Sequence, residues 1–301
     1  MTVETIDVCI CTFRRASLEH TLASIAAQVL PTQVRLRVVV VDNDETDTRR
    51  IEIAAAARAL QLELQYVHAP KFNISIARNA CLDAASSDWM AFIDDDEVAA
   101  PNWIAALLAC RAGADIVFGP SQALYSDPRI APWVAAADLH SSRIAASAPW
   151  NGYTGNVLID RRLILRHRLR FEIELGQIGG EDTAFFLAAH RAGARFAYAP
   201  AAVVLEEVPI ARANLTWLAR RRFRSGQIHY MLHGQGRRAI GIVAAAKAAL
   251  CWGHALTAGA SSGRARQSAL RGMLHAGVVA SALGFAPYRE YRAPTDPQRK
   301  P

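Results

Sequence analysis

Short apolar runs alternate with amphipathic stretches through the first third of the chain. The runs are rich in β-branched and aromatic residues, which predicts strands at Ile6 to Cys11, Arg35 to Val41, Leu62 to His68 and Trp89 to Ile93. The intervening stretches of about ten to fifteen residues predict helices, capped by Ser17, Thr46 and Ser75. Strands that alternate with helices indicate an α/β fold with a mainly parallel central sheet and helices on both faces.

The alternation of apolar runs and amphipathic stretches is less regular after residue 100. We expect helices at Pro101 to Arg111 and Thr183 to Arg191, and strands at Asp115 to Phe118 and Val157 to Ile159. Two turn-rich segments lie between them, Asn151 to Asn156 and Gly176 to Gly180. Small residues at such turns let the backbone approach a ligand closely, although a plain hairpin turn explains the first segment equally well.

The composition changes near residue 214. Arginines cluster at Arg220 to Arg224, and two apolar segments follow, Ala239 to Ala258 and Ala269 to Phe285. The first is long enough to span a bilayer, but its central Lys247 and the arginines after it favour a helix that lies in the membrane plane. A helical pair packed on the main domain fits almost as well. We expect a first domain at residues 1–225 and a basic, apolar helical C-terminal extension at residues 226–301.

Polar residues follow the predicted strands where each strand ends. They are Thr12, Asp42, the segment Asn73 to Asn79 and the acids Asp94 to Glu97. Ligands of open α/β sheets bind beyond the carboxyl ends of the strands, so these clusters predict one site. The chain has no G-x-G-x-x-G after its first strand and no G-x-x-x-x-G-K-[ST], which disfavours a dinucleotide fold and a P-loop.

Four consecutive acids, Asp94 to Glu97, follow the apolar run Trp89 to Ile93. Adjacent carboxylates repel one another unless a cation or hydrogen-bond donors meet them. In an extended segment Asp94 and Asp96 share one face while Asp95 points to the other. Two such carboxylates suit Mg²⁺ or Mn²⁺, which commonly complete their coordination with substrate phosphates. On this segment alone, a solvated acidic turn is an equally good explanation.

Composition and charge limit the classes of binding partner that we expect. The chain is 52% hydrophobic and 20% charged, as in ordinary globular proteins, and its formal charge of +7 favours anionic partners. It lacks nucleic-acid motifs, which leaves phosphorylated substrates and an acidic membrane surface ahead of nucleic acid. The five scattered cysteines predict reduced thiols. The polar segment Met1 to Asp7 has no apolar stretch of a signal peptide, so we expect a cytoplasmic protein.

Five motifs then stand in a characteristic order along the chain. They are Cys11-Thr12-Phe13-Arg14-Arg15, Val39-Val40-Val41-Asp42-Asn43, Asn73-Ile74-Ser75-Ile76-Ala77-Arg78-Asn79, Phe92-Ile93-Asp94-Asp95-Asp96 and Gly180-Glu181-Asp182. In this order they resemble family 2 glycosyltransferases of GT-A fold, in particular the bacterial polysaccharide branch that includes succinoglycan-type glucosyltransferases. The resemblance covers about residues 5 to 225. Two motifs depart from it: Asp-Gly-Ser is here Asp42-Asn43-Asp44, and Asp-x-Asp-Asp ends here in Glu97.

The resemblance implies a role for each cluster. It implies nucleotide-sugar binding by Thr12, Arg14, Asp42, Arg78, Asp94 and Asp95. Asp42 would accept hydrogen bonds from the base, and Arg78 would reach the base or the diphosphate. Asp96, with Asp94, would hold the Mg²⁺ or Mn²⁺ that bridges the diphosphate. Asp182 would be the general base for the acceptor hydroxyl, with Glu181 orienting it or the acceptor.

The function that the resemblance implies is an inverting, metal-dependent hexosyltransferase. It would move a hexose from a nucleotide-diphosphate sugar to a polyprenyl-diphosphate-linked glycan, peripherally at the cytoplasmic face of the inner membrane. A sugar-phosphate nucleotidyltransferase is one alternative, but the loop Thr12 to Ser17 has arginines and no glycine, which that class would normally show. A membrane-docked scaffold without activity is another, and a scaffold has no chemical need for Asp94, Asp96 and Asp182.

Overall fold

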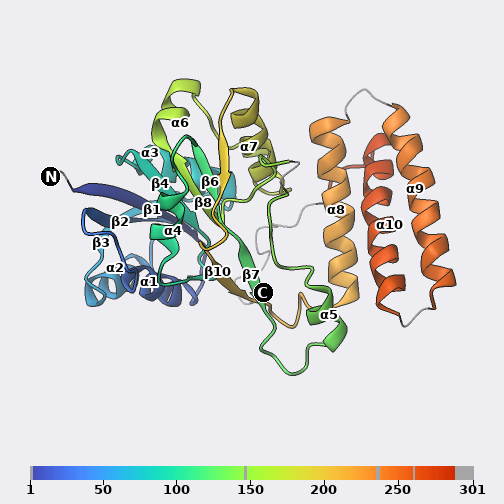
Figure 1. Cartoon of the computed structure of the whole chain (residues 1–301), viewed down its shortest axis with the longest axis horizontal. Coiled ribbons are helices and arrows are strands. Elements are labelled where there is room, and N and C mark those ends of the chain that lie inside the picture. The colour runs from blue at the N-terminus through green and yellow to red at the C-terminus, as the bar shows by residue number, and fades with distance from the viewer. Residues whose placement is uncertain (1–2, 146–147, 235–237, 260–261, 289–301) are drawn as a thin grey trace.

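The computed structural model describes residues 3–145, 148–234, 238–259 and 262–288. In these residues a seven-stranded sheet has the order β3-β2-β1-β4-β8-β6-β9 (Figure 1). Its strands are β1 (Glu4–Thr12), β2 (Val34–Asp42), β3 (Glu63–His68), β4 (Trp89–Ile93), β6 (Ile116–Phe118), β8 (Asn156–Asp160) and β9 (Phe196–Tyr198). The first four strands are parallel, as predicted, whereas β8 runs antiparallel to both β4 and β6. The sheet is therefore mixed but mainly parallel.

A second, three-stranded sheet was not predicted. It has the order β5-β10-β7, with β5 (Glu97–Ala99), β7 (Ser121–Leu124) and β10 (Val204–Glu207). These strands are only three or four residues long. β5 starts at the last of the four acids, so this sheet anchors one end of the acidic segment.

Helices cover both faces of the central sheet. They are α1 (Leu18–Ala26), α2 (Arg50–Ala59), α3 (Ile74–Ala84), α4 (Trp103–Ala109), α6 (Arg161–His167) and α7 (Glu181–Arg191), with the 3₁₀-helix η1 (Ile173–Leu175) before α7. The short helix α5 (Pro132–Ala137) packs instead in a separate small core with Ile130, Val208 and Ala213. In β4, Ala91 and Ile93 pack towards α1 and α4, while Met90 and Phe92 pack towards α3, α6 and α7. Alternating side chains thus build two cores from one buried strand, which confirms the predicted fold class.

Two of the three predicted helix caps are wrong. The cap of α3 is Asn73, whose side chain accepts a hydrogen bond from the amide of Ile76 at 3.2 Å, and Ser75 is already inside the helix. α2 begins at Arg50, well after Thr46. Ser17 does precede α1, but its side chain makes no capping bond. Ser, Thr and Asn all satisfy the same cap chemistry, so a polar cluster does not identify which member is used.

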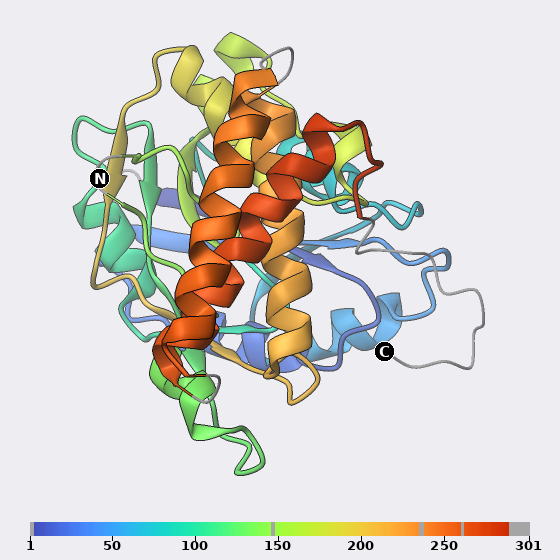
Figure 2. The same cartoon turned by 90° about the vertical axis from the view of Figure 1, so that its right-hand side faces the viewer.

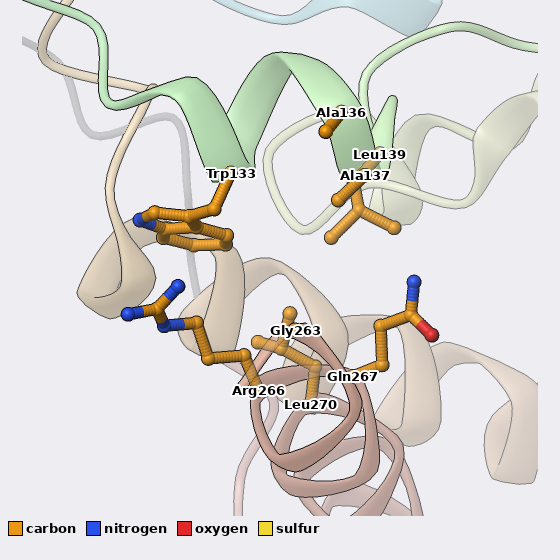
Figure 3. A pocket seen from close by; sticks show the side chains of 8 residues that line it. All are labelled: Trp133, Ala136, Ala137, Leu139, Gly263, Arg266, Gln267 and Leu270. Atoms are coloured by element: carbon orange, nitrogen blue, oxygen red, sulfur yellow. The ribbon is translucent and has the colours of Figure 1, made fainter. Parts of the chain in front are cut away.

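The last three helices form a layer beside the main body (Figures 1 and 2). They are α8 (Leu215–His233), α9 (Arg238–Thr257) and α10 (Gly263–Ala282), and α10 packs against both of the others. α8 continues across the domain boundary that the sequence predicted between residues 225 and 226. Arg266 of α10 stacks over the ring of Trp133 in α5 at 4.8 Å, beside a cavity of about 130 Å³ (Figure 3). The division into two domains stays a prediction.

The contact between α8 and α10 depends on two glycines. A Cβ on Gly277 would overlap the carbonyl oxygen of Phe223, and a Cβ on Gly226 would overlap that of Leu274. The two helix backbones therefore approach as closely as they do only because neither position carries a side chain.

We predict that Gly277→Ala lowers the free energy of unfolding by about 1–3 kcal/mol, because the added methyl group overpacks this contact. Gly253→Ala in α9 is the matched control, since a Cβ there meets nothing within 4 Å. The control should be neutral or raise the stability by up to about 1 kcal/mol through helix propensity. Urea unfolding of the full chain measures both, and equal effects of the two substitutions would contradict the close contact.

Candidate active site

The four acids form a turn at the end of β4 in which exposed and buried side chains alternate. Asp94 and Asp96 retain 48% and 23% of their side-chain exposure, whereas Asp95 and Glu97 are buried. Thr12 Oγ1 donates a hydrogen bond to Asp95 Oδ2 at 2.7 Å. The backbone is a turn at Asp95 and Asp96 rather than the expected extended strand, yet the two accessible carboxylates are the predicted ones.

Glu97 is buried and makes hydrogen bonds within the protein. Its Oε2 accepts a hydrogen bond from the amide of Asp94 at 3.1 Å, and its Oε1 accepts one from Ser121 Oγ at 2.8 Å. Burial and the nearby Asp94 raise the pKa of Glu97 well above its ordinary value. Glu97 therefore closes the acidic turn and ties it to β7.

Arg78 lies at the centre of the site. Its Nη1 donates to Glu181 Oε1 and to Asp182 Oδ1, both at 2.6 Å, and its Nη2 lies 3.8 Å from Asp94 Oδ1. Burial would lower the pKa of Arg78, but the three carboxylates outweigh this effect and raise it. The side chain is 8% exposed and those of Glu181 and Asp182 are 9% and 15% exposed, so these three groups are largely removed from water. Arg78 therefore joins the acids that follow β4 to the acids that begin α7.

Two asparagines, Asn73 at the N-terminus of α3 and Asn79 inside it, bond to the segment that precedes α7. Asn73 Nδ2 donates to the carbonyl of Ile173 at 2.9 Å. Asn79 Nδ2 donates to the carbonyl of Phe171, and its Oδ1 accepts from the amide of the same residue, both at 2.9 Å. Gly176 lies so close to Asn73 that a Cβ would overlap the Asn73 side chain. These bonds hold the segment before α7 against α3.

Thr154 is a site residue that the sequence alone did not identify. Its Oγ1 donates to Asp182 Oδ1 at 2.8 Å, and its amide approaches Asp182 Oδ2 at a longer 3.4 Å. It lies in the predicted turn segment Asn151 to Asn156, which was the available signal. In that segment a Cβ on Gly155 would lie 3.0 Å from Asp94 Oδ2, so the backbone passes close to the acidic turn, as small residues permit.

Glu181 differs from Asp182 in its surroundings. The side chain of Glu181 is buried, and its Oε2 has no hydrogen-bond partner among the described residues. Burial and the neighbouring Asp182 raise the pKa of Glu181, against the lowering effect of Arg78. A buried carboxyl oxygen without a partner is unfavourable in its charged form, in keeping with the direction of this pKa shift.

The remaining predicted residues lie at the ends of β1 and β2, where Thr12 pairs in register with Asp42. Asp42 is buried, and its two oxygens accept from Tyr66 Oη at 2.9 Å and from the amide of Asp44 at 3.0 Å. Arg14 forms a two-point pair with Asp44 at 2.7 and 2.8 Å. The sequence analysis named Asp44 only as part of a departure from the family motif and did not identify Tyr66. The structure thus places Arg14 and Asp42 at the predicted edge of the sheet, each already engaged with protein partners.

The site carries more negative than positive charge. Arg78 faces three carboxylates, and the nearest cation to Asp96 is Arg15, 3.3 Å from its Oδ2. Burial, with Asp96 and Asp182, raises the pKa of Asp94 to about 7, although Arg78 opposes the shift. Because 48% of the Asp94 side chain is exposed, water screens part of this effect. A divalent cation would relieve the repulsion.

The carboxylate oxygens of this turn are donors that Mg²⁺ and Mn²⁺ prefer. No group of three or more His, Cys, Asp or Glu in the described residues is arranged to hold a metal ion. The two accessible acids, Asp94 and Asp96, could therefore supply only part of a coordination shell. The residues fit a metal whose other ligands come from a phosphorylated substrate and water.

Two comparisons with known proteins give matches over more than half of the chain. Residues 7–179 match glycosyl transferase family 2. The chain is 42% identical over 298 residues to the succinoglycan biosynthesis protein ExoM of Rhizobium meliloti (strain 1021), with 96% of each sequence covered. These findings confirm the predicted family resemblance.

Two solved structures show the same fold. The mannosyltransferase PcManGT of Pyrobaculum calidifontis, in complex with GDP-Man and Mn²⁺, matches with a TM-score of 0.61 and 22% identity, over 91% of this chain and 86% of that one. S. aureus TarS 1-349 in complex with UDP-GlcNAc matches with a TM-score of 0.54 and 16% identity, over 95% and 93%. At these identities the likeness shows the fold alone.

We predict that Arg78→Met lowers the free energy of unfolding by about 3–5 kcal/mol, because it leaves the carboxylates of Glu181 and Asp182 close together without their cation. Arg170→Met is the control: Arg170 also pairs with an acid, Asp83, but both side chains are more than half exposed. That substitution should cost about 1 kcal/mol or less. Urea unfolding measures both, and an Arg78→Met protein as stable as the wild type would refute the ionic link.

Proposed function

This chain belongs to glycosyltransferase family 2, and on that basis we propose that it transfers a hexose, with inversion, from a nucleotide-diphosphate sugar to a growing polyprenyl-diphosphate-linked bacterial surface polysaccharide. The observation that carries the proposal is the link through Arg78 between the accessible acid Asp94 and the pair Glu181-Asp182. A relative named as a succinoglycan biosynthesis protein supports a polysaccharide acceptor. Family membership favours sugar transfer over the nucleotidyltransferase and scaffold alternatives.

On the donor side, Asp94 and Asp96 would hold Mg²⁺ or Mn²⁺. The ion would supply positive charge beside the diphosphate as the bond to the sugar breaks. Thr12 fixes Asp95 behind these two acids, which orients the turn. Arg14, Asp42 and Arg78 would complete the donor side, and Asp95 would act on it through the turn that it supports. The solved mannosyltransferase with GDP-Man and Mn²⁺ supports this choice of donor class and cofactor.

On the acceptor side, Asp182 would act as the general base. Its Oδ1 already accepts hydrogen bonds from Arg78 and Thr154, whereas among the described residues Oδ2 has only the 3.4 Å approach of the Thr154 amide. Oδ2 is thus the oxygen left for an acceptor hydroxyl. The hydroxyl oxygen would bond to the anomeric carbon as the carbon–diphosphate bond breaks, and its proton would pass to Asp182. One displacement of this kind inverts the anomeric centre. Glu181 would help orient Asp182, because Arg78 Nη1 donates to both side chains.

A polyprenyl-linked acceptor would place the protein at the cytoplasmic face of the inner membrane, as a peripheral protein. Among the described residues, one helix segment, Ala239–Thr257, is long and apolar enough to cross a membrane by length and composition, and 11% of it is buried. Length and composition do not distinguish a spanning helix from one that lies on the surface.

We predict that Asp96→Asn and Asp182→Asn separate binding from turnover. Asp96→Asn should weaken metal-dependent donor binding, measured by calorimetry with Mg²⁺ and with Mn²⁺. Asp182→Asn should leave donor binding largely intact and lower kcat by about 10²–10⁴-fold, the usual contribution of a general base. A screen of nucleotide sugars that measures nucleoside diphosphate release identifies the donor first.

Asp83→Asn is the matched control, because Asp83 lies on α3 with 61% of its side chain exposed. It should bind donor and turn over like the wild type. An Asp182→Asn protein with full turnover would contradict the assignment of the base, and activity that survives removal of divalent ions by a chelator would contradict the role of Asp94 and Asp96 as metal ligands.

A further inference from the structure

The helix α9 presents most of its large apolar residues to the outside. Its most buried positions, spaced three and four residues apart, carry small side chains: Gly241, Ala244 and Ala248, with Cys251 and Ala255 half-buried. Two large residues reach the inner side, Ile240, which is half-buried, and Trp252, which is 41% exposed and lies against Gly272 of α10. By contrast, Ile242, Val243, Leu250 and Leu256 are 72%, 52%, 65% and 85% exposed. A helix of a soluble domain normally shows the opposite arrangement. Something apolar is therefore expected to cover the outer side of α9.

The outward residues form one continuous face. At 3.6 residues per turn, Ile242, Val243, Leu250 and Leu256 fall on the same side of the helix, together with the exposed Ala246. The only Lys, Arg, His, Asp or Glu within Ala239–Thr257 are Lys247 and His254, which lie along one edge of this face. An apolar face with a polar edge is typical of a helix that lies in a membrane interface.

The charge of the helical layer identifies the kind of surface. The chain has no Asp or Glu between Glu207 and Glu290, an interval that includes all three helices. Exposed cations in this layer are Arg220, Lys247, Arg264 and Arg271. A cationic layer with an apolar face is complementary to a bilayer that contains anionic lipids.

The packing of α9 favours a helix that lies on the membrane over one that crosses it. α9 contacts α10 along its length, and α10 in turn packs on α8, so α9 is the outermost helix of the layer (Figures 1 and 2). If α9 crossed the bilayer, α10 with Arg264 and Arg271 would be drawn into the hydrocarbon, at high cost.

We propose that α9 docks flat on an anionic bilayer surface, with Ile242, Val243, Leu250 and Leu256 entering the headgroup region. The proposal rests on the proposed function only in that a lipid-linked acceptor would be presented at the same surface. α8 connects this layer to the site, because Arg224 and Ile228 lie against Gly179 and Gly180, which precede Glu181. Docking would thus hold the active site beside the membrane.

The test is flotation of the full chain with vesicles of phosphatidylcholine alone or mixed with an equal amount of phosphatidylglycerol. The wild type should float with the mixed vesicles, less so at high salt, and poorly with phosphatidylcholine alone. The double variant Leu250→Glu with Leu256→Glu should reduce the partition coefficient by about tenfold or more. The matched control is Ile51→Glu with Leu165→Glu, two exposed apolar residues of α2 and α6, which should float like the wild type.

Circular dichroism and the unfolding midpoint establish that each variant is folded. Ala246→Glu, at an exposed position of the same face, repeats the test if the double variant is unstable. Undiminished flotation of the folded variants would overturn the proposal. Binding to either vesicle that withstands alkaline carbonate would indicate a spanning helix instead. A dimer without vesicles that the double variant converts to a monomer would show that a second copy covers α9.

These variants distinguish a failure of the docking proposal from a failure of the proposed function. The Asp182→Asn protein should float like the wild type, and the α9 variant should transfer sugar to a water-soluble acceptor at the wild-type rate. A wild-type protein that transfers sugar but does not float with the mixed vesicles would refute the docking of α9 alone. A wild-type protein that floats but transfers sugar from no nucleotide sugar would refute the proposed function alone.

Discussion

The guanidinium group of Arg78 holds together two parts of the chain that lie more than a hundred residues apart in sequence. It is almost fully buried and bonded to Glu181 and Asp182, with Asp94 nearby, so its removal would leave three neighbouring carboxylates without this cation. The asparagines of α3 and the glycines before α7 serve this contact, because they bring the two backbones close enough for it. The site thus depends on one cation that its own acids surround.

This arrangement divides the acids by environment. Asp95 and Glu97 face Thr12 and Ser121 and act as supports, while Asp94 and Asp96 remain accessible. The antiparallel strand β8 contributes to this difference in surroundings. The turn before it places Thr154 against Asp182 and brings the backbone of Gly155 close to Asp94. The proposed metal ligands and the proposed base are thereby neighbouring side chains with different partners.

Much of the fold could be predicted from the sequence, because the central strands are buried on both faces and appear as continuous apolar runs. The strand Trp89 to Ile93 has the predicted bounds. The direction of β8 could not be predicted, since hydrophobic periodicity is the same for a parallel and an antiparallel strand. The strands β5, β7, β9 and β10 are too short to show a period. The polar clusters identified the edge of the sheet, but their pairing, such as Thr154 with Asp182, depends on tertiary contacts that no local pattern contains.

The central claim is that Asp182 deprotonates the acceptor while the acids after β4 serve the departing diphosphate, in one displacement. The most direct measurement is the ¹H NMR spectrum of the transfer product, in which the coupling constant of the new anomeric proton reports its configuration. With the donor that supports transfer, the account predicts a product of the opposite anomeric configuration to the donor. Retention of the donor configuration would require a second displacement and would contradict the account.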